Sequence, residues 1–367
     1  MSFSLSLEFT LIEAWRKRKF LAFYGRPKES NCYSLKPGPY QFPKVNRIKM
    51  DNGVSSRLTV KRISSSPYFS FDFSQLEKET IEGFKTAEML PLNSSEITSV
   101  LITNTHTDLS LVSDQQLKAC QLMIHPNSGY DNFSREFVAL AQFPIVLGNE
   151  IRANAVTNYI LSALFSHYSA IPVEQNWNKL RKWPRKLLSE LNILILGQGH
   201  IGSLLKSSLS PLVKEVRVYD PHAGLPDLNL QKIDVLIPAC SLNSFNQSFI
   251  DEFMLLQLNE DFLLINAARG DLVNTEELIE VLKLRPRAFA ILDVFEKEPC
   301  DFSLFSSLTN ISLSSHIAGV YANIDQVTAN FVARVIADFS ELSPEEFDQL
   351  YESMLLKNRL HADGFLI

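Results

Sequence analysis

The chain has 367 residues, which is more than an average single domain and enough for two. Hydrophobic residues make up 46% of it and charged residues 21%, as in ordinary globular proteins, and the formal net charge is −6. This acidic balance argues against nucleic acid as the main ligand, because nucleic-acid binders usually carry a basic face.

Cysteine usage and the terminal residues indicate a cytoplasmic protein. The four cysteines are far apart in sequence, so they predict no metal-binding knuckle and no CxxC redox pair, and such scatter suits a reducing compartment. The sequence contains no run of about 18 apolar residues, so it predicts no membrane span. The apolar stretch 3–12 precedes the basic run 16–19, the reverse of the order in a secretory signal. We interpret the basic run as a solvated helix face.

The first part of the chain alternates between polar connections and short apolar runs. Residues 25–70 are rich in Pro, Ser, Asn and Lys and predict irregular connections with one strand over 57–63. Farther on, the sequence predicts strands over residues 100–103, 121–125 and 144–147, a helix over 113–120 and a loop over 126–132. This alternation of strand and helix indicates a parallel sheet.

A second series of strands follows a predicted helix over 153–167 and a polar connection over 172–185. Its strands are predicted over residues 192–196, 215–219, 235–238, 262–266, 288–292 and 311–313. Helices fit between most of them, and the clearest begins after Asn274, an N-cap residue with Glu277 three positions on. Strands joined by helical crossovers predict a doubly wound sheet. An amphipathic helix over 323–342 comes after this series.

Two α/β domains account for this pattern. The second series predicts one domain over residues 151–319. The earlier strands predict another over residues 1–150, and we expect the late helix to return to it, which adds residues 320–367.

A glycine-rich loop opens the second series. The strand over 192–196 runs directly into Gly197-Gln198-Gly199-His200-Ile201-Gly202, a G-x-G-x-x-G pattern. Gly197 can make the tight turn, Gly199 lets the backbone approach a pyrophosphate, and Gly202 lets helix and strand pack closely. The helix that follows offers free N–H groups and the positive end of its dipole to the phosphates. The loop therefore predicts a dinucleotide-binding domain.

Asp220, at the end of the next predicted strand, indicates which dinucleotide. An acidic side chain there can accept hydrogen bonds from both ribose hydroxyls and repels a 2′-phosphate, which favours NAD over NADP. The alternatives are a structural turn with a surface aspartate, and a methyltransferase-like fold with a similar loop. The residues downstream argue against the methyltransferase.

Three polar segments follow later strands and carry Arg269, Glu298 and His316. Ligands of open α/β sheets bind beyond the carboxyl ends of the strands, so these side chains can converge there. Arginine binds a carboxylate and polarises a carbonyl, histidine exchanges an alcohol proton, and glutamate orients the imidazole. Singly, each residue has an ordinary alternative as a helix cap, a loop carboxylate or a half-buried histidine. Together they predict a hydride-transfer site that uses a nicotinamide cofactor.

These motifs resemble the signature of the D-isomer-specific 2-hydroxyacid dehydrogenases over residues 97–342. The resemblance implies an NAD-dependent oxidoreductase that reversibly reduces a small 2-keto acid, similar to glyoxylate, hydroxypyruvate or pyruvate, to a D-2-hydroxy acid; a phosphoglycerate-like substrate stays open. It implies a Rossmann-type NAD-binding domain inserted into a smaller, flavodoxin-like substrate-binding domain, with a cleft between them. It also implies a homodimer built partly through the helix that starts near Ala153.

Residue roles follow from the same resemblance. Arg269 is expected to bind and polarise the substrate, and His316, paired with Glu298, to act as the acid/base. Backbone groups of Ser128 and Gly129 are expected to hold the substrate carboxylate, since the loop 126–132 also resembles the family's. Besides the glycine loop, with His200 and Ile201, the expected cofactor contacts come from Asp220, Pro238, Ala267 and Asp293. No metal, nucleic-acid or membrane partner is expected.

The chain also departs from the family pattern. Residues 238–243 replace a segment that usually begins Pro-Leu-Thr, Thr157 and Asn158 stand where the family has Ala-Glu, and Ser315 replaces a frequent proline. Residues 1–90 match poorly and motivate a second hypothesis, an NAD(H)-sensing, corepressor-like binding protein. We prefer the enzyme because its predicted catalytic set is complete. Glu298 argues against a formate dehydrogenase, whose relatives carry glutamine there.

Overall fold

The computed structural model describes residues 57–66, 69–183, 185–243 and 245–360. The apolar and basic stretches within residues 3–19 lie outside the described residues. The described chain forms two compact units: the central unit, residues 153–319, and the split unit, residues 57–152 with 320–360. The chain therefore passes from one unit to the other after Arg152 and again after Gly319.

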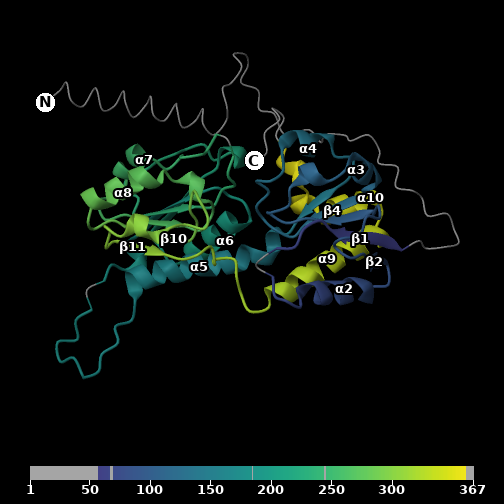
Figure 1. The fold of residues 1–367 in the computed structure, drawn as a ribbon. Coiled ribbons are helices and arrows are strands. Elements are labelled where there is room, and N and C mark those ends of the chain that lie inside the picture. The colour runs from purple at the N-terminus through teal and green to yellow at the C-terminus, as the bar shows by residue number, and fades with distance from the viewer. Residues whose placement is uncertain (1–56, 67–68, 184, 244, 361–367) are drawn as a thin grey trace, which may run out of the picture. The chain divides into compact units, whose positions relative to one another are not determined.

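The central unit is built on a six-stranded parallel sheet (Figure 1). Its strands are β6 (Asn192–Leu196), β7 (Glu215–Tyr219), β8 (Val235–Pro238), β9 (Leu263–Asn266), β10 (Phe289–Leu292) and β11 (Ile311–Leu313). The inner strands β6, β8 and β9 are apolar along most of their length and fully buried. Two separate core clusters draw on their side chains, as expected for a parallel sheet covered on both faces.

The strand order of this sheet is β11-β10-β9-β8-β6-β7. The chain adds β7 on one side of β6 and then returns to add β8 on the other, so the sheet is doubly wound, as predicted. Its described helices include α5 (Asn149–Ser169), α6 (His200–Leu209), α7 (Glu252–Leu256) and α8 (Thr275–Leu284). The strand order reverses at β6, and doubly wound folds bind ligands at the carboxyl ends of the strands at such a point, here β6 and β8.

The split unit holds a five-stranded parallel sheet in the order β2-β1-β3-β4-β5. Its strands are β1 (Leu58–Arg62), β2 (Ala87–Met89), β3 (Val100–Ile102), β4 (Leu122–His125) and β5 (Ile145–Leu147). Its helices include α2 (Phe73–Gly83), α3 (Asp114–Ala119), α4 (Arg135–Leu140), α9 (Ile324–Glu341) and α10 (Pro344–Leu350). This is the flavodoxin-like strand order.

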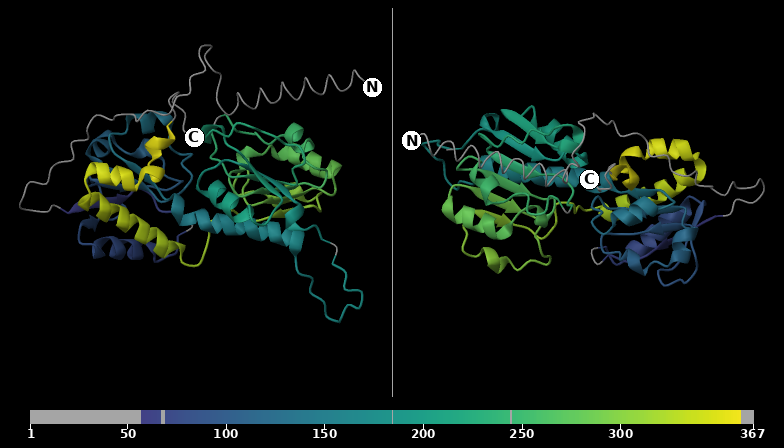
Figure 2. Two further views of the ribbon diagram at one scale, coloured as in Figure 1. Left: turned by 180° about the vertical axis from the view of Figure 1, so that it is seen from behind. Right: turned by 90° about the horizontal axis from the view of Figure 1, so that it is seen from above.

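Helix α9 confirms the prediction that the late helix returns to the earlier strands. Figures 1 and 2 show it beside α2, although the two helices lie at opposite ends of the described chain. Phe331, Val332 and Val335 of α9 share a buried cluster with residues of β1, β3 and β4. The apolar face that made the sequence amphipathic is thus the face that covers this sheet.

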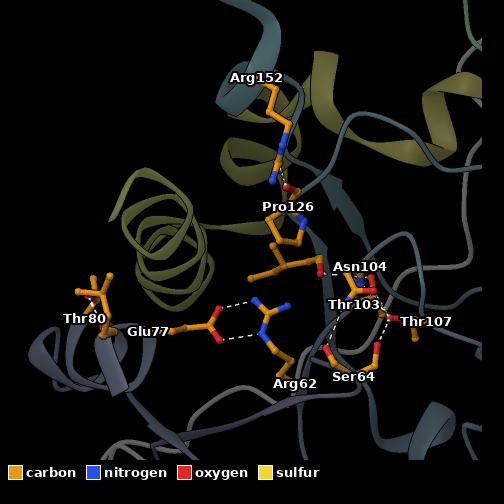
Figure 3. Close-up of polar contacts among 11 residues, drawn as sticks. Arg62, Ser64, Glu77, Thr80, Thr103, Asn104, Thr107, Pro126 and Arg152 are labelled. Carbon is orange, nitrogen blue, oxygen red and sulfur yellow. Dashed lines mark hydrogen bonds and ion pairs between the residues drawn. The ribbon is translucent and has the colours of Figure 1, made fainter. Parts of the chain in front are cut away.

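Most predicted strands agree with the structure to within one or two residues, but α2 was not predicted. Its buried positions are Phe73, Glu77 and Ile81, so one of the three inward side chains is an acid and the apolar stripe is broken. Arg62 at the end of β1 donates from Nε to Glu77 at 2.8 Å, and its second nitrogen, Nη2, binds the other carboxylate oxygen (Figure 3). The charge pair makes this inward glutamate possible.

The N-terminal caps of two helices can be compared with the sequence signals for them. Asn274 caps α8 as predicted, accepting the N–H of Glu277 at 3.1 Å, but the Glu277 carboxylate accepts the N–H of Glu252 in α7 instead of closing a capping box. A full capping box exists at Ser343 and Glu346, before α10. Among the described residues, no helix has the length and apolar character needed to cross a bilayer.

Candidate active site

The glycine loop after β6 takes the conformation that the sequence predicts. Gly197 has φ +103°, and a Cβ there would lie 2.8 Å from backbone atoms of Cys240, in the loop after β8. A Cβ on Gly202 would lie 2.0 Å from the carbonyl oxygen of Gly197. Both glycines are therefore required by the local packing, and the predicted tight turn and close helix–strand approach are confirmed.

Gly199 differs from its two neighbours because a Cβ there would meet nothing within 4 Å. It is the N-cap of α6, whose first residues are His200 and Ile201. Protein packing does not explain this glycine, but a ligand lying against the backbone would. Open space at the Cβ position of Gly199, at the start of a ten-residue helix, leaves room for a pyrophosphate.

Asp220 follows β7 and is tied to the glycine loop. Its Oδ2 accepts the N–H of Gln198 at 2.6 Å and its Oδ1 accepts the N–H of Ala223 at 3.1 Å. The side chain is only partly buried. Because a carboxylate has about four acceptor positions, Asp220 can hold the loop and still accept hydrogen bonds from a ribose. The predicted contact with the ribose stays a prediction.

Pro238 ends β8 next to Leu196, the last residue of β6. The residues after it, which depart from the family pattern, form a loop packed against Gly197. Asn246 supports this loop through a 2.7 Å hydrogen bond from its amide nitrogen to Ser241 O. Pro238 is buried, and its predicted contact with the cofactor stays a prediction.

The turn after β9 is organised by Asn266, a residue that the sequence reasoning did not single out. The buried amide accepts the N–H of Ala268 at 3.1 Å and donates to the carbonyl of Arg269 at 2.9 Å. Ala267, a predicted cofactor contact, is 8% exposed. A Cβ on Gly270 would lie 1.9 Å from the carbonyl carbon of Phe295, so this turn packs tightly on the loop after β10. Arg269 is thereby positioned from both sides.

His316 and Glu298 lie together, as predicted. The imidazole Nδ1 is 2.7 Å from Glu298 Oε2, while Glu298 Oε1 accepts the N–H of Phe295 at 3.0 Å. The carboxylate thus bridges the histidine and the loop after β10, and it fixes the ring orientation. Within the described part of the chain, Nε2 of His316 has no hydrogen bond, so it is the ring nitrogen available to a substrate.

Asp293 supports the loop that carries His316. Its carboxylate is fully buried and accepts hydrogen bonds from Ser314 and from the backbone of Ile317 and Ala318. The sequence pattern indicated a contact between Asp293 and the cofactor, which stays a prediction. The structure adds Ser314 to the site, together with Tyr159 of α5, which hydrogen-bonds to it.

Register places these groups along one edge of the sheet. Asn266 pairs with Leu292, and Leu292 with Leu313, so the turns that carry Arg269, Glu298 and His316 leave neighbouring strands at one level. All strands of the sheet run parallel, so the glycine loop leaves from this edge too. A guanidinium, an imidazole–carboxylate pair and a phosphate-binding loop on one edge can bind a carboxylate and move a proton beside a dinucleotide.

Ser128 and Gly129 belong to the split unit, in the loop after β4. His125 anchors this loop: its Nε2 lies 2.8 Å from Gly129 O and its Nδ1 lies 2.9 Å from Thr103 Oγ1. Burial lowers the pKa of His125 to about 4, so the ring is neutral near pH 7. The N–H groups of Ser128 and Gly129 donate to no backbone carbonyl of the described chain, so they are open to an anion.

Two further contacts hold this loop, of which Figure 3 shows the one between Arg152 and Pro126. Arg152 Nη1 donates to Pro126 O at 2.9 Å, and burial lowers the pKa of Arg152. Asn132 donates to the carbonyls of Asn104 and Thr107 at 3.1 and 3.0 Å. These hydrogen bonds anchor both ends of the loop.

Comparison with known proteins points to the family that the sequence resembles. Residues 161–318 match the model of the D-isomer specific 2-hydroxyacid dehydrogenase, NAD binding domain. The chain is 29% identical over 215 residues to a 2-ketogluconate reductase of Gluconobacter oxydans, covering 53% of this chain and 69% of the relative. It is 26% identical over 255 residues to a glyoxylate/hydroxypyruvate reductase of Arabidopsis thaliana, covering 63% and 78%.

Solved structures share the fold. A D-isomer specific 2-hydroxyacid dehydrogenase from Xanthobacter autotrophicus, in complex with NADPH and MES, matches with a TM-score of 0.60 and 17% sequence identity. The match covers 80% of this chain and 100% of that one.

Proposed function

We propose that this chain, whose residues 161–318 match the NAD-binding domain of the D-isomer specific 2-hydroxyacid dehydrogenases, reversibly reduces a small 2-keto acid to a D-2-hydroxy acid with NADH. The observation that carries the proposal is the His316–Glu298 pair on the sheet edge that bears the glycine loop. The bound nicotinamide supplies or accepts the hydride, which no side chain can do.

Substrate binding falls to Arg269, Ser128 and Gly129. The Arg269 guanidinium can pair with the substrate carboxylate and polarise the adjacent keto group. In the split unit, the N–H groups of Ser128 and Gly129, which donate to no backbone carbonyl of the described chain, suit an anion such as a carboxylate, because backbone donors bind anions without needing a charge.

Proton transfer falls to His316. In the reductive direction its Nε2 donates a proton to the keto oxygen as the alcohol forms, and in the oxidative direction Nε2 takes that proton back. Glu298 accepts from Nδ1 and so stabilises the protonated ring before transfer. Because Glu298 is held by Phe295 N–H, its second oxygen stays directed at the imidazole.

The proposed preference for NADH over NADPH depends on Asp220. Its carboxylate lies beside the glycine loop, where a 2′-phosphate would meet a negative charge. A relative of the same fold holds NADPH, so the choice depends on local residues. We expect NADH to support a higher kcat/KM than NADPH.

The test is NADH oxidation by the full chain with glyoxylate, hydroxypyruvate, pyruvate, 2-ketogluconate and a phosphorylated keto acid, each repeated with NADPH. Names of the relatives guide this panel. Turnover of at least one keto acid to a D-product, lost on His316→Gln and kept on His106→Gln, is the expected result. His106 is an exposed histidine of the split unit and provides the matched control. Binding of NADH without turnover of any member would overturn the proposal.

A cytoplasmic homodimer is the state we expect. The segment after α5 exposes several large apolar side chains: Ile171, Val173, Trp177 and Leu180 are 74–96% exposed. Such a surface favours burial against a second copy. Light scattering of the full chain, and of a variant with Trp177→Ser and Leu180→Ser, tests this: a monomer in both cases contradicts it.

A further inference from the structure

The backbone of His316 is strained, which raises the question of what holds it. Its φ is +54°, in the left-handed region that non-glycine residues rarely adopt. Such a conformation costs of order 1–3 kcal/mol and persists only where neighbouring contacts determine it fully. His316 also lies three residues before the point where the chain leaves the central unit, after Gly319. The loop therefore needs its own anchor.

Asp293 provides that anchor with four hydrogen bonds. Its backbone carbonyl accepts the N–H of His316 at 2.8 Å. Its Oδ1 accepts Ser314 Oγ at 2.6 Å and Ile317 N at 2.8 Å, and its Oδ2 accepts Ala318 N at 2.8 Å. One fully buried residue thus holds the chain before, at and after His316. A carboxylate can do this because both of its oxygens are acceptors.

Tyr159 of α5 extends the anchor. Its hydroxyl lies 2.7 Å from Ser314 Oγ, and because Ser314 donates to Asp293, the tyrosine is the donor in this contact. Burial raises the pKa of Tyr159, so its hydroxyl keeps its proton at neutral pH. A hydrogen-bond chain therefore runs from Tyr159 through Ser314 to Asp293. It joins α5, where the chain enters the central unit, to the loop where it leaves.

We propose that Tyr159, Ser314 and Asp293 are positioning residues that hold His316 in its strained conformation, with Nδ1 toward Glu298 and Nε2 toward the substrate. This inference rests on the proposed function of His316 as acid/base. It assigns Asp293 a role in addition to its expected contact with the cofactor, since three hydrogen bonds from the loop already end on its carboxylate. Ser314 and Tyr159 gain a role in the reaction without touching substrate.

Steady-state kinetics of the full chain separate this role from a general effect on folding. Tyr159→Phe and Ser314→Ala each remove one neutral hydrogen bond, so kcat should fall about 2- to 10-fold, with the KM for the keto acid and the Kd for NADH unchanged. Asp293→Asn removes an acceptor from the loop, and kcat should fall about 100-fold. Ser314→Thr keeps the hydroxyl and should retain activity. Ser315→Ala, in an exposed adjacent serine, is the matched control and should leave kcat unchanged.

A double-mutant cycle tests whether the chain acts as a unit. Because Tyr159 acts through Ser314, the Tyr159→Phe/Ser314→Ala variant should lose no more activity than the worse single variant, whereas Tyr159→Phe/Ser315→Ala should show additive effects. Full additivity of the first pair, or equal losses of stability with no change in kcat, would overturn the proposal.

A spectroscopic readout keeps the inference independent of turnover. The imidazole resonances of His316, assigned in the full chain by their loss in His316→Gln, should shift in Tyr159→Phe and Asp293→Asn and not in Ser315→Ala. If the wild-type protein reduces no keto acid but these shifts occur, the proposed function fails and the positioning role stands. If the resonances do not move, the positioning role fails, whatever the activity.

Discussion

The six-stranded sheet of the central unit and the five-stranded sheet of the split unit both start from a strand with the second strand on one side and the third on the other. Both therefore have a point where the strand order reverses, and folds of this kind bind ligands at the carboxyl ends of the strands there. In the central unit this edge carries half-exposed reactive groups, Arg269, Glu298 and His316. In the split unit it carries buried polar side chains, among them Arg62, Thr103 and His125.

The difference shows that topology supplies a place and local chemistry decides its use. In the central unit, buried polar residues support the loops that carry the reactive ones. Asp293 accepts hydrogen bonds from the loop of His316, and Asn266 donates to the carbonyl of Arg269. In the split unit, the buried His125 instead supports a loop whose exposed part is the backbone of Ser128 and Gly129. One sheet presents side chains, and the other presents N–H groups on a rigid loop. The two kinds of edge should respond differently to substitution.

The two histidines give the sharpest contrast. His316→Gln removes the proposed acid/base, which typically contributes 10²–10⁴ in rate, so kcat should fall about 10³-fold while the midpoint of urea unfolding hardly moves. His125→Gln should do the reverse, lowering the unfolding midpoint and changing kcat much less. Activity and urea unfolding of both variants check this. A His125→Gln variant that is stable but inactive, together with an active His316→Gln variant, would contradict the roles assigned to the two histidines.

Buried charge gives the next largest effect, on stability. Glu77→Gln leaves the Arg62 guanidinium buried without its counter-charge, and Nη1 of Arg62 already has no hydrogen-bond partner in the described structure. We expect a loss of about 3–5 kcal/mol in the free energy of unfolding. The double variant Arg62→Met/Glu77→Leu should regain most of it, because an apolar pair needs no partner.

The control for this prediction comes from the central unit. Arg287 and Glu260 form a pair of which both side chains are 69% exposed. Glu260→Gln should change the free energy of unfolding by less than about 0.5 kcal/mol, because solvent screens exposed pairs. Equal losses from Glu77→Gln and Glu260→Gln would contradict the account of α2 as a helix held by a buried charge.

These two units also show what the sequence could reveal. Gly197, Gly199 and Gly202 were predictable because a turn of positive φ, an open backbone and a close helix–strand contact act within a few residues. The His316–Glu298 pair was predictable because both residues follow strands of a recognisable series. Helix α2 was not, since its inward Glu77 makes sense only beside Arg62, fifteen positions earlier.

The Tyr159–Ser314–Asp293 chain marks a second limit. Tyr159 and Ser314 are 155 residues apart, and each has an unremarkable surrounding sequence. Only the fold brings α5 against the loop after β11. Asp293 was noticed for its motif, but its burial and its four hydrogen bonds are tertiary facts. Residues that act on a ligand leave local patterns, whereas residues that act on other residues do so less often.

Acidification should weaken the split unit through His125. Its folded pKa is about 4, below the value of about 6.5 in an unfolded chain, so the unfolded state binds more protons between these values. Stability is therefore full above pH 6.5 and is lost as the pH falls toward 4, by roughly 3 kcal/mol. Urea unfolding of wild type and His125→Gln at pH 7 and pH 4.5 measures this. A variant as pH-sensitive as the wild type would show that other groups control acid unfolding.

The smallest expected effects come from the helix caps, and they ask whether the two units unfold together. Asn274 caps α8 of the central unit, and Ser343 caps α10 of the split unit. Replacing either by Ala should cost about 1 kcal/mol. If the units unfold as one, both variants shift a single transition. If they unfold separately, Asn274→Ala shifts the transition reported by loss of NADH binding, and Ser343→Ala shifts the other. Two compact units, each with its own buried core, favour the second outcome. A single shared transition would mean that the two cores unfold as one cooperative unit.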